Sequence, residues 1–165
     1  ESREIFIKRS QIVHEMRAFL HNEDFIEVET PILQPLYGGA AARPFETRHN
    51  ALDLKLYLRI ADELYLKRLI AGGLPRVFEI GKDFRNEGID RTHSPEFTMM
   101  ECYTAGEDYK FCIGLIERMI PVIAKKVTPS LEVTYKQNSI NLRSPFLQAT
   151  MHELIKDACG IDIIS

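Results

Sequence analysis

The chain has 165 residues, of which 45% are hydrophobic and 27% charged, and its formal net charge is -3. These values are ordinary for a soluble protein with one domain, and they exclude a globally basic nucleic-acid-binding surface. No apolar run approaches the roughly 20 residues of a membrane span, and the amino-terminal ESREIFIKRSQ lacks the apolar core of a signal peptide.

The three cysteines, Cys102, Cys112 and Cys159, lack the spacing of a metal site, and their odd number does not fit a disulfide framework. We therefore predict reduced thiols, a cytoplasmic location and no membrane association. The sequence begins without methionine and stops at IDIIS, inside an expected element. Both features predict a piece of a longer protein.

The amino-terminal part is predicted to be a helix followed by a short strand. Apolar residues recur at helical spacing over residues 3–22. FIEVET, residues 25–30, is typical of a strand, which Pro31 ends because proline has no N–H to donate. Residues 34–44 are predicted to form a loop. Its two glycines, Gly38 and Gly39, permit close approach of a ligand to the backbone.

The middle of the chain contains the most regular alternation. Leucines and one isoleucine alternate with polar residues over 52–60, which predicts a half-buried antiparallel strand. A helix then begins at Asp62, and the glycine pair 72–73 stops it. Residues 76–87 and 96–105 are predicted to be two strands joined by a loop.

The last third is predicted to mix a long helix, a hairpin and a short helix. The long helix covers about 108–126, with Pro121 as a kink or a boundary. LEVTY and SINLR form a hairpin around 136–138, and Thr150 with Glu153 starts the last helix as a capping box. Helices mixed with antiparallel strands predict an α+β fold.

The strands around the loop at 88–95 carry the side chains of chemical interest. Because strand side chains alternate between faces, Arg85 and Glu87 share one face of the first strand. Phe97, Glu101 and Tyr103 share one face of the second. A solvated hairpin face is one interpretation. A face that mixes aromatic, carboxylate and guanidinium groups is, however, typical of a ligand-binding surface.

Each of these groups has a task that its chemistry allows. An arginine binds phosphate or carboxylate oxygens with two directed hydrogen bonds. Phe97 can stack on a base, which is worth roughly 1–3 kcal/mol. Glu101 and Tyr103 can hold an ammonium group, and His93 can meet outer phosphates. The residues therefore favour a nucleoside triphosphate beside a small cationic molecule.

Two long stretches resemble the class II aminoacyl-tRNA synthetases. FRNEGIDRTHSPEFTMMECY, residues 84–103, resembles their motif 2, and VETPIL, residues 28–33, resembles the end of motif 1. GGAAARPF, residues 38–45, and YLRIADELYLKRLIAGG, residues 57–73, are similar to the lysyl-tRNA synthetases within that class. The resemblance covers nearly the whole chain.

The resemblance implies one partial, truncated catalytic domain over 1–165, with an antiparallel sheet flanked by helices. Motif 1 would cover about 8–33 and motif 2 about 76–105. Neither motif 3 nor the anticodon-binding OB-fold of the family is recognisable. We therefore expect the isolated chain to be inactive in aminoacylation.

The resemblance also implies residue roles. Arg85 would be catalytic, bridging the α-phosphate of ATP and the carboxylate of lysine. Glu87, His93 and Phe97 would bind ATP with it. The lysine-binding residues would share a pocket beside the nucleotide: Gly39, Glu63, Arg85, Glu101 and Tyr103. Pro31 would lie at the interface of a homodimer. On sequence grounds alone, Glu63 is also compatible with a helix start, and His93 with a loop residue bonded to backbone.

The implied activity is ATP-dependent activation of lysine and its transfer to tRNA(Lys). Magnesium would assist, with protein ligands outside this chain, so that no metal ligand is assigned here. Two alternatives stay open: a paralogue that transfers lysine to a protein, and a catalytically dead nucleotide-binding or dimerisation module.

Overall fold

A computed structural model describes residues 2–164, which form two compact units. One unit contains residues 16–108. The other contains the residues before Met16 and those from Tyr109 onward. Within the described residues, no helix combines the length and the apolar character needed to cross a membrane.

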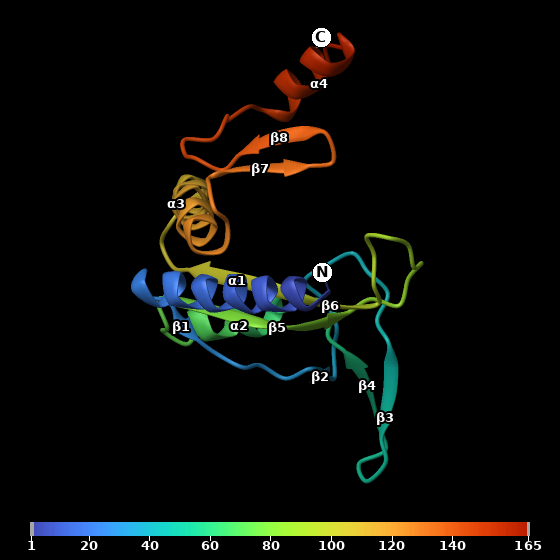
Figure 1. The fold of residues 1–165 in the computed structure, drawn as a ribbon. Coiled ribbons are helices and arrows are strands. Elements are labelled where there is room, and N and C mark those ends of the chain that lie inside the picture. Colours follow the sequence, from blue (N-terminus) through green and yellow to red (C-terminus); the bar gives the residue numbers. More distant parts are fainter. Residues whose placement is uncertain (1, 165) are drawn as a thin grey trace. The chain divides into compact units, whose positions relative to one another are not determined.

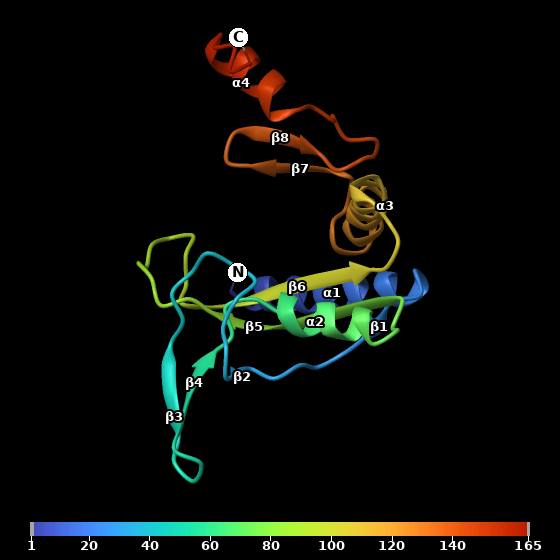
Figure 2. The ribbon, with the colours of Figure 1, turned by 180° about the vertical axis from the view of Figure 1, so that it is seen from behind.

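A three-stranded sheet forms the centre of the unit at 16–108. Its order is β1 (Ile26–Glu27), β5 (Arg76–Phe84) and β6 (Glu96–Thr104). β5 and β6 pair antiparallel along their whole length, as predicted. β1 pairs parallel with β5, so the expectation of a purely antiparallel sheet is wrong. Helix α2 (Glu63–Ala71) packs against β5 and β6 (Figure 2).

The predicted strand at 25–30 is shorter than expected. After β1, the Val28 N–H still donates to the Phe78 carbonyl at 2.9 Å. The Thr30 N–H donates instead to the Glu79 carboxylate, at 3.2 Å from each oxygen. A side chain therefore replaces the backbone partner that a longer ladder would supply, and the strand ends.

A second sheet has the order β2 (Leu33–Gln34), β4 (Leu54–Leu58) and β3 (Glu46–His49), and both of its pairings are antiparallel. The β3–β4 ribbon extends away from β5 and β6 (Figure 1). Leu54 is 51% exposed, so the predicted half-buried face exists only toward the end of β4. Alternation identifies a strand, but a covering layer decides its burial.

The core of this unit is built from the end of helix α1 (Ser2–Asn22), the residues after β4, α2 and β5. The His21 ring meets Phe78 edge-on, with 5.3 Å between the ring centroids. The buried apolar side chains are Phe19, Leu20, Phe25, Ile60, Ala61, Leu66, Val77 and Phe78.

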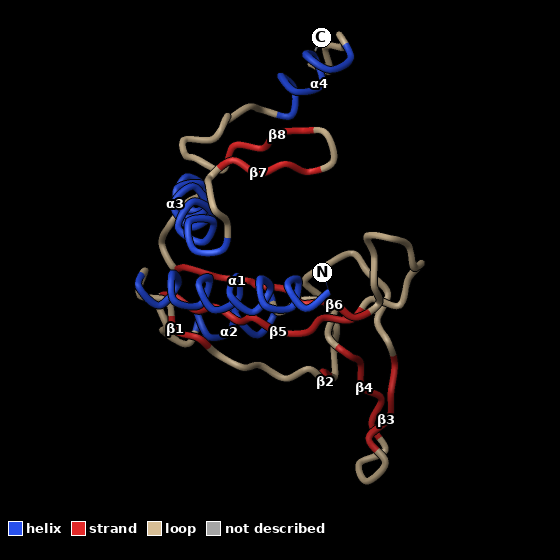
Figure 3. Tube along the Cα trace, in the orientation of Figure 1, coloured by secondary structure: helices blue, strands red, loops and turns tan. Residues whose placement is uncertain are grey.

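The other unit contains α3 (Tyr109–Val127), the hairpin of β7 (Glu132–Tyr135) and β8 (Asn138–Asn141), and α4 (Met151–Cys159) (Figure 3). The hairpin and the capping box of α4 are confirmed. Helix α3 continues past Pro121, which excludes a boundary there, and the alternative of a kink stays a prediction. Pro121 is buried, and its apolar packing offsets the missing N–H. All three cysteines are free of disulfides, as predicted.

Candidate functional site

The register of β5 and β6 brings the candidate side chains to one face of the sheet. Phe97 lies opposite Asp83 and Glu101 opposite Glu79. The Arg85 N–H donates to the Pro95 carbonyl at 2.9 Å, which continues the pairing by one residue. Because alternate residues of paired strands share a face, Arg85, Phe97 and Glu101 all point to the same side.

A cavity of about 320 Å³ opens at the loop end of this face. Its volume is at the lower end of the range of small-molecule sites. The Arg85 guanidinium carbon lies 5.1 Å from the centroid of the Phe97 ring, within cation–π distance. The residues that line the cavity include all four that are expected to bind ATP, which are Arg85, Glu87, His93 and Phe97. Gly88, Thr92 and Ser94 complete the lining.

The loop at this cavity is held by the Asp90 carboxylate. It accepts hydrogen bonds from the backbone N–H groups of Thr92 at 2.7 Å and His93 at 2.8 Å. It also pairs with the Nδ1 atom of His93 at 2.8 Å. These hydrogen bonds hold the pKa of Asp90 well below its usual range, and the bond from the Thr92 backbone N–H has the largest effect. The turn fixes His93 at the cavity, and the sequence signal for it is the Asp-x-Thr-His spacing.

Two hydrogen bonds to Arg43 connect the start of this loop to the rest of the unit. The Glu87 carboxylate accepts a hydrogen bond from the Arg43 N–H at 3.2 Å, and the Asn86 N–H donates to the Arg43 carbonyl at 2.8 Å. Residues of the 34–44 loop therefore hold one wall of the cavity in place.

Glu101 and Tyr103 form a hydrogen-bonded pair further along β6. The Tyr103 hydroxyl donates to Glu101 Oε2 at 3.1 Å, and the Asp62 N–H donates to Oε1 at 3.4 Å. Burial, and after it the Glu101 charge, raises the pKa of Tyr103. The phenol therefore stays protonated at neutral pH and keeps an oxygen lone pair for a further donor.

The remaining residues expected to bind lysine, Gly39 and Glu63, meet in the same unit. Gly39 has a φ of +87°, and a Cβ at this position would lie 2.8 Å from Glu63 Cβ. Only glycine fits this backbone and this contact. Glu63 also pairs with Lys67 at 2.6 Å on the exposed side of α2. Its charge acts on the Tyr103 phenol, which places Glu63 near the Glu101–Tyr103 pair.

Pro31 follows the short strand β1 and is exposed. Its carbonyl accepts a hydrogen bond from Gln34 Nε2 at 3.0 Å. The role of Pro31 at a subunit interface stays a prediction.

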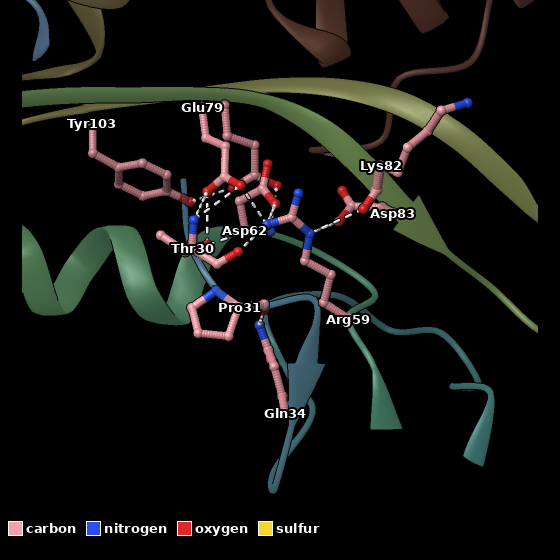
Figure 4. A network of polar contacts seen from close by, with 10 residues as sticks. Thr30, Pro31, Gln34, Arg59, Asp62, Glu79, Lys82, Asp83 and Tyr103 are labelled. Atoms are coloured by element: carbon pink, nitrogen blue, oxygen red, sulfur yellow. Dashed lines mark hydrogen bonds and ion pairs between the residues drawn. The ribbon is translucent and has the colours of Figure 1, made fainter. Parts of the chain in front are cut away.

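A buried arginine lies on this same face, at a position where the sequence pattern predicts a structural or surface charge. Arg59 is 1% exposed, so it is structural and not on the surface. Its guanidinium pairs with three carboxylates (Figure 4): Glu79 at 2.5 Å, Asp62 at 3.0 Å and Asp83 at 3.2 Å. It also donates to the carbonyls of Lys82 at 2.9 Å and Thr30 at 3.3 Å.

The carboxylates around Arg59 outnumber it. One oxygen from each of Asp62, Asp83 and Glu101 lies within 4.8 Å of the other two. Burial, and next the Asp83 charge, raises the pKa of Asp62 to about 8. Burial also raises the pKa of Asp83 to about 6, although Arg59 opposes it. At neutral pH this cluster therefore retains protons that an exposed pair of aspartates would lose.

Comparison with known proteins gives consistent matches over almost the whole chain. A family model described as tRNA synthetases class II (D, K and N) matches residues 1–163. The lysine–tRNA ligase of Chloroflexus aurantiacus is 55% identical over 163 residues, which is 99% of this chain and 33% of that relative.

Two further relatives agree with the first. The lysine–tRNA ligase of Clostridium tetani is 54% identical over 160 residues, covering 97% of this chain and 32% of its own length. Lysine–tRNA ligase 2 of Methanosarcina acetivorans is 52% identical over 165 residues, which is 100% of this chain and 32% of that relative. The chain spans about a third of the length of these curated relatives.

Proposed function

Because the chain belongs to the class II tRNA synthetases (D, K and N), we propose that it forms the ATP- and lysine-binding part of a lysine–tRNA ligase. One observation carries the proposal. The cavity that contains Arg85 and Phe97 lies on the same face of β6 as the hydrogen-bonded pair Glu101–Tyr103. Lysine–tRNA ligases at 52–55% identity support the choice of amino acid.

The proposal includes the organisation of the domain. Residues 1–165 are part of a class II catalytic domain, with motif 1 at about 8–33 and motif 2 at about 76–105. Pro31 contributes to the interface of a homodimer. The relatives' greater length supports a partial domain. Below, the full-length protein means the complete polypeptide in which these residues occur.

In the first step, a carboxylate oxygen of lysine attacks the α-phosphorus of ATP. The bond to the bridging oxygen breaks, pyrophosphate leaves with the electron pair, and lysyl-adenylate forms. Arg85 holds the attacking carboxylate and the α-phosphate together and neutralises the charge that develops between them. Phe97 stacks on adenine, Glu87 accepts from its amino group, and His93 donates to the outer phosphates.

In the second step, a ribose hydroxyl at the end of tRNA(Lys) attacks the carbonyl carbon of the adenylate and AMP leaves. The lysine side chain is meanwhile held by Glu101 and Tyr103. Because the Tyr103 hydroxyl donates to Glu101, its oxygen accepts a hydrogen bond from the ammonium while the carboxylate supplies the charge.

Magnesium belongs to the chemistry of this family, where it would supply positive charge to the phosphates of ATP. The residues that line the cavity do not fit as its ligands, because Glu87 is their only carboxylate and it is bonded to the Arg43 N–H. Among the described residues, the acids close enough together to hold a metal ion are Asp62, Asp83 and Glu101, but both aspartates are buried and pair with Arg59. No step is therefore assigned to magnesium on these residues.

An ATP–pyrophosphate exchange assay on the full-length protein tests this function. We expect exchange that depends on lysine and not on aspartate or asparagine, the other amino acids of the family. Arg85→Ala should abolish it. Lys82→Ala is the matched control, since Lys82 projects from the opposite face of the sheet and pairs with Glu96 at 3.1 Å. Exchange driven by aspartate or asparagine, or none at all, would contradict the proposal.

A further inference from the structure

We propose that Asp62 and Asp83 share a proton that leaves the protein when an ammonium group binds beside Glu101, so that amine binding and proton release are one linked event. This inference rests on the proposed function, because the ligand is the ammonium of an amino acid. It assigns a task to two residues that have no place in the reaction described above.

The first support is the balance of buried charge. The side chains of Asp62 and Asp83 are 0% exposed, and that of Glu79 is 5% exposed. All three contact the guanidinium of Arg59, which is itself 1% exposed. A single positive charge cannot compensate three ionised carboxylates in a region that water does not reach, so a bound proton or a further cation must do so.

The second support is the way in which the two aspartates contact their surroundings. Arg59 lies at ion-pair distance, but none of the four carboxylate oxygens of Asp62 and Asp83 accepts a hydrogen bond within the described residues. A buried carboxylate without a hydrogen bond is costly. If one of the two aspartates is protonated, it can donate a hydrogen bond to the other. This lowers both the cost of the excess buried charge and the cost of the missing hydrogen bonds.

The third support is the position of Glu101. One of its oxygens lies within 4.8 Å of oxygens of both aspartates, and the Asp62 N–H donates to it. A positive charge bound at Glu101 is therefore close enough to stabilise the ionised form of the pair. The raised pKa values of Asp62 and Asp83, due first to burial, leave a proton available for release near neutral pH.

The charged and titratable groups around the pair come from every element packed on it. Arg59 after β4 and Arg85 after β5 favour the ionised form, whereas Glu79 on β5 and Glu101 on β6 oppose it. Among the neighbouring groups are Arg59, Glu79, Arg85 and Glu101, together with Tyr103 and the Glu63 carboxylate that acts on it. Of these, Glu101 is the one that receives the ligand, so binding there adds a positive charge close to the pair.

Titration calorimetry of lysine into the full-length protein tests the inference at pH 7, between the two raised pKa values. The same titration is run in phosphate and in Tris, whose ionisation enthalpies differ widely. We expect the two heats to differ by an amount corresponding to the release of a large fraction of one proton for each lysine bound. Equal heats in the two buffers would overturn the linkage.

Variants identify the source of the proton. Asp62→Asn and Asp83→Asn should each bind lysine with the buffer dependence removed. Glu96→Gln is the control, because this carboxylate pairs with Lys82 on the opposite face of the sheet and its loss should leave the release unchanged. Release that persists in both asparagine variants would refute the assignment to this pair. If a variant fails to fold, as judged by circular dichroism, the wild-type comparison between buffers still decides.

The outcomes separate the two proposals. Lysine that binds with equal heat in both buffers overturns the proton linkage alone. Lysine that fails to bind at all, while the protein is folded, overturns the proposed function and the linkage with it.

Discussion

Gly81 lies directly against the guanidinium of Arg59, and a Cβ added at Gly81 would overlap Arg59 Nη2. A glycine is therefore required in the middle of β5, because the guanidinium of Arg59 occupies the space that a side chain would fill. Glycine weakens the interior of a strand, so we infer that the contacts of Arg59 stabilise the fold by more than the glycine destabilises the strand.

Gly81→Ala should consequently destabilise the protein by displacing Arg59 from its carboxylates. Breaking a buried ion pair costs about 3–5 kcal/mol, and we expect a loss of unfolding free energy of that order, measured by urea denaturation. Gly88→Ala is the matched control, because a Cβ added at Gly88 would have no neighbour within 4 Å in the described residues. Equal stability of the two variants would contradict the packing argument.

The raised pKa values of Asp62 and Asp83 make the stability of the folded protein depend on pH. Asp83 has a pKa of about 6 in the folded protein, against 3.8 for an ordinary aspartate. The folded state therefore binds more protons than the unfolded state between these values, and stability falls as the pH rises through this window. The loss for Asp83 is up to about 3 kcal/mol, since one pKa unit corresponds to 1.36 kcal/mol.

Asp83→Asn should flatten this decline. The difference in unfolding free energy between pH 4 and pH 7 is the quantity to measure, in the wild type and in the variant. Glu96→Gln serves as the control, because that exposed carboxylate lies on the opposite face and should leave the difference unchanged. A variant that loses as much stability as the wild type over this interval would show that Asp83 is ionised throughout.

The sequence allowed the β5–β6 pair and its common face to be predicted because both depend on local alternation. The pattern of alternate residues from Phe97 to Tyr103 is visible in a short window, and the observed register places them as expected. The glycine at 39 and the acid at 63 could be placed together only through the family resemblance, because nothing in their own neighbourhoods links them.

The features that were missed depend on partners far apart in the chain. The parallel pairing of Ile26 with Val77 joins segments about fifty residues apart, which no local period reveals. Arg59 falls at a polar position of an alternating strand, which is typical of a solvent-facing residue. Its carboxylate partners Asp62, Glu79 and Asp83 come from the start of α2 and from two positions of β5, so only the folded chain shows that it is buried.

Glu101→Gln should weaken lysine binding far more than ATP binding. The change removes the charge that meets the ammonium while it keeps the shape of the side chain. Hydrogen bonds to charged groups contribute about 1.5–3 kcal/mol, so we expect a loss of roughly 10- to 100-fold in lysine affinity. Calorimetric titration of each ligand measures this. Similar losses for lysine and ATP would count against a selective role for Glu101.

Asp90→Ala should have the opposite selectivity. Asp90 holds the turn that fixes His93 at the cavity, and it has no contact with the Glu101–Tyr103 pair in the described residues. We expect ATP binding to weaken roughly tenfold, because a displaced positioning group loses its alignment with the phosphates. Lysine affinity should stay within about twofold of the wild type. Asp90→Asn, which keeps an oxygen acceptor, should recover part of the loss, and failure to do so would argue against the turn.

The isolated 165-residue chain should not support lysine-dependent ATP–pyrophosphate exchange. ATP is a polyanion at neutral pH, whereas Arg85 and His93 are the basic side chains among the residues that line the cavity. Relatives about three times as long supply further residues, and we expect some of them to complete the phosphate site. The ligase of Chloroflexus aurantiacus is the positive control. Exchange by the isolated chain at a comparable rate would show that Arg85 and its neighbours suffice for activation.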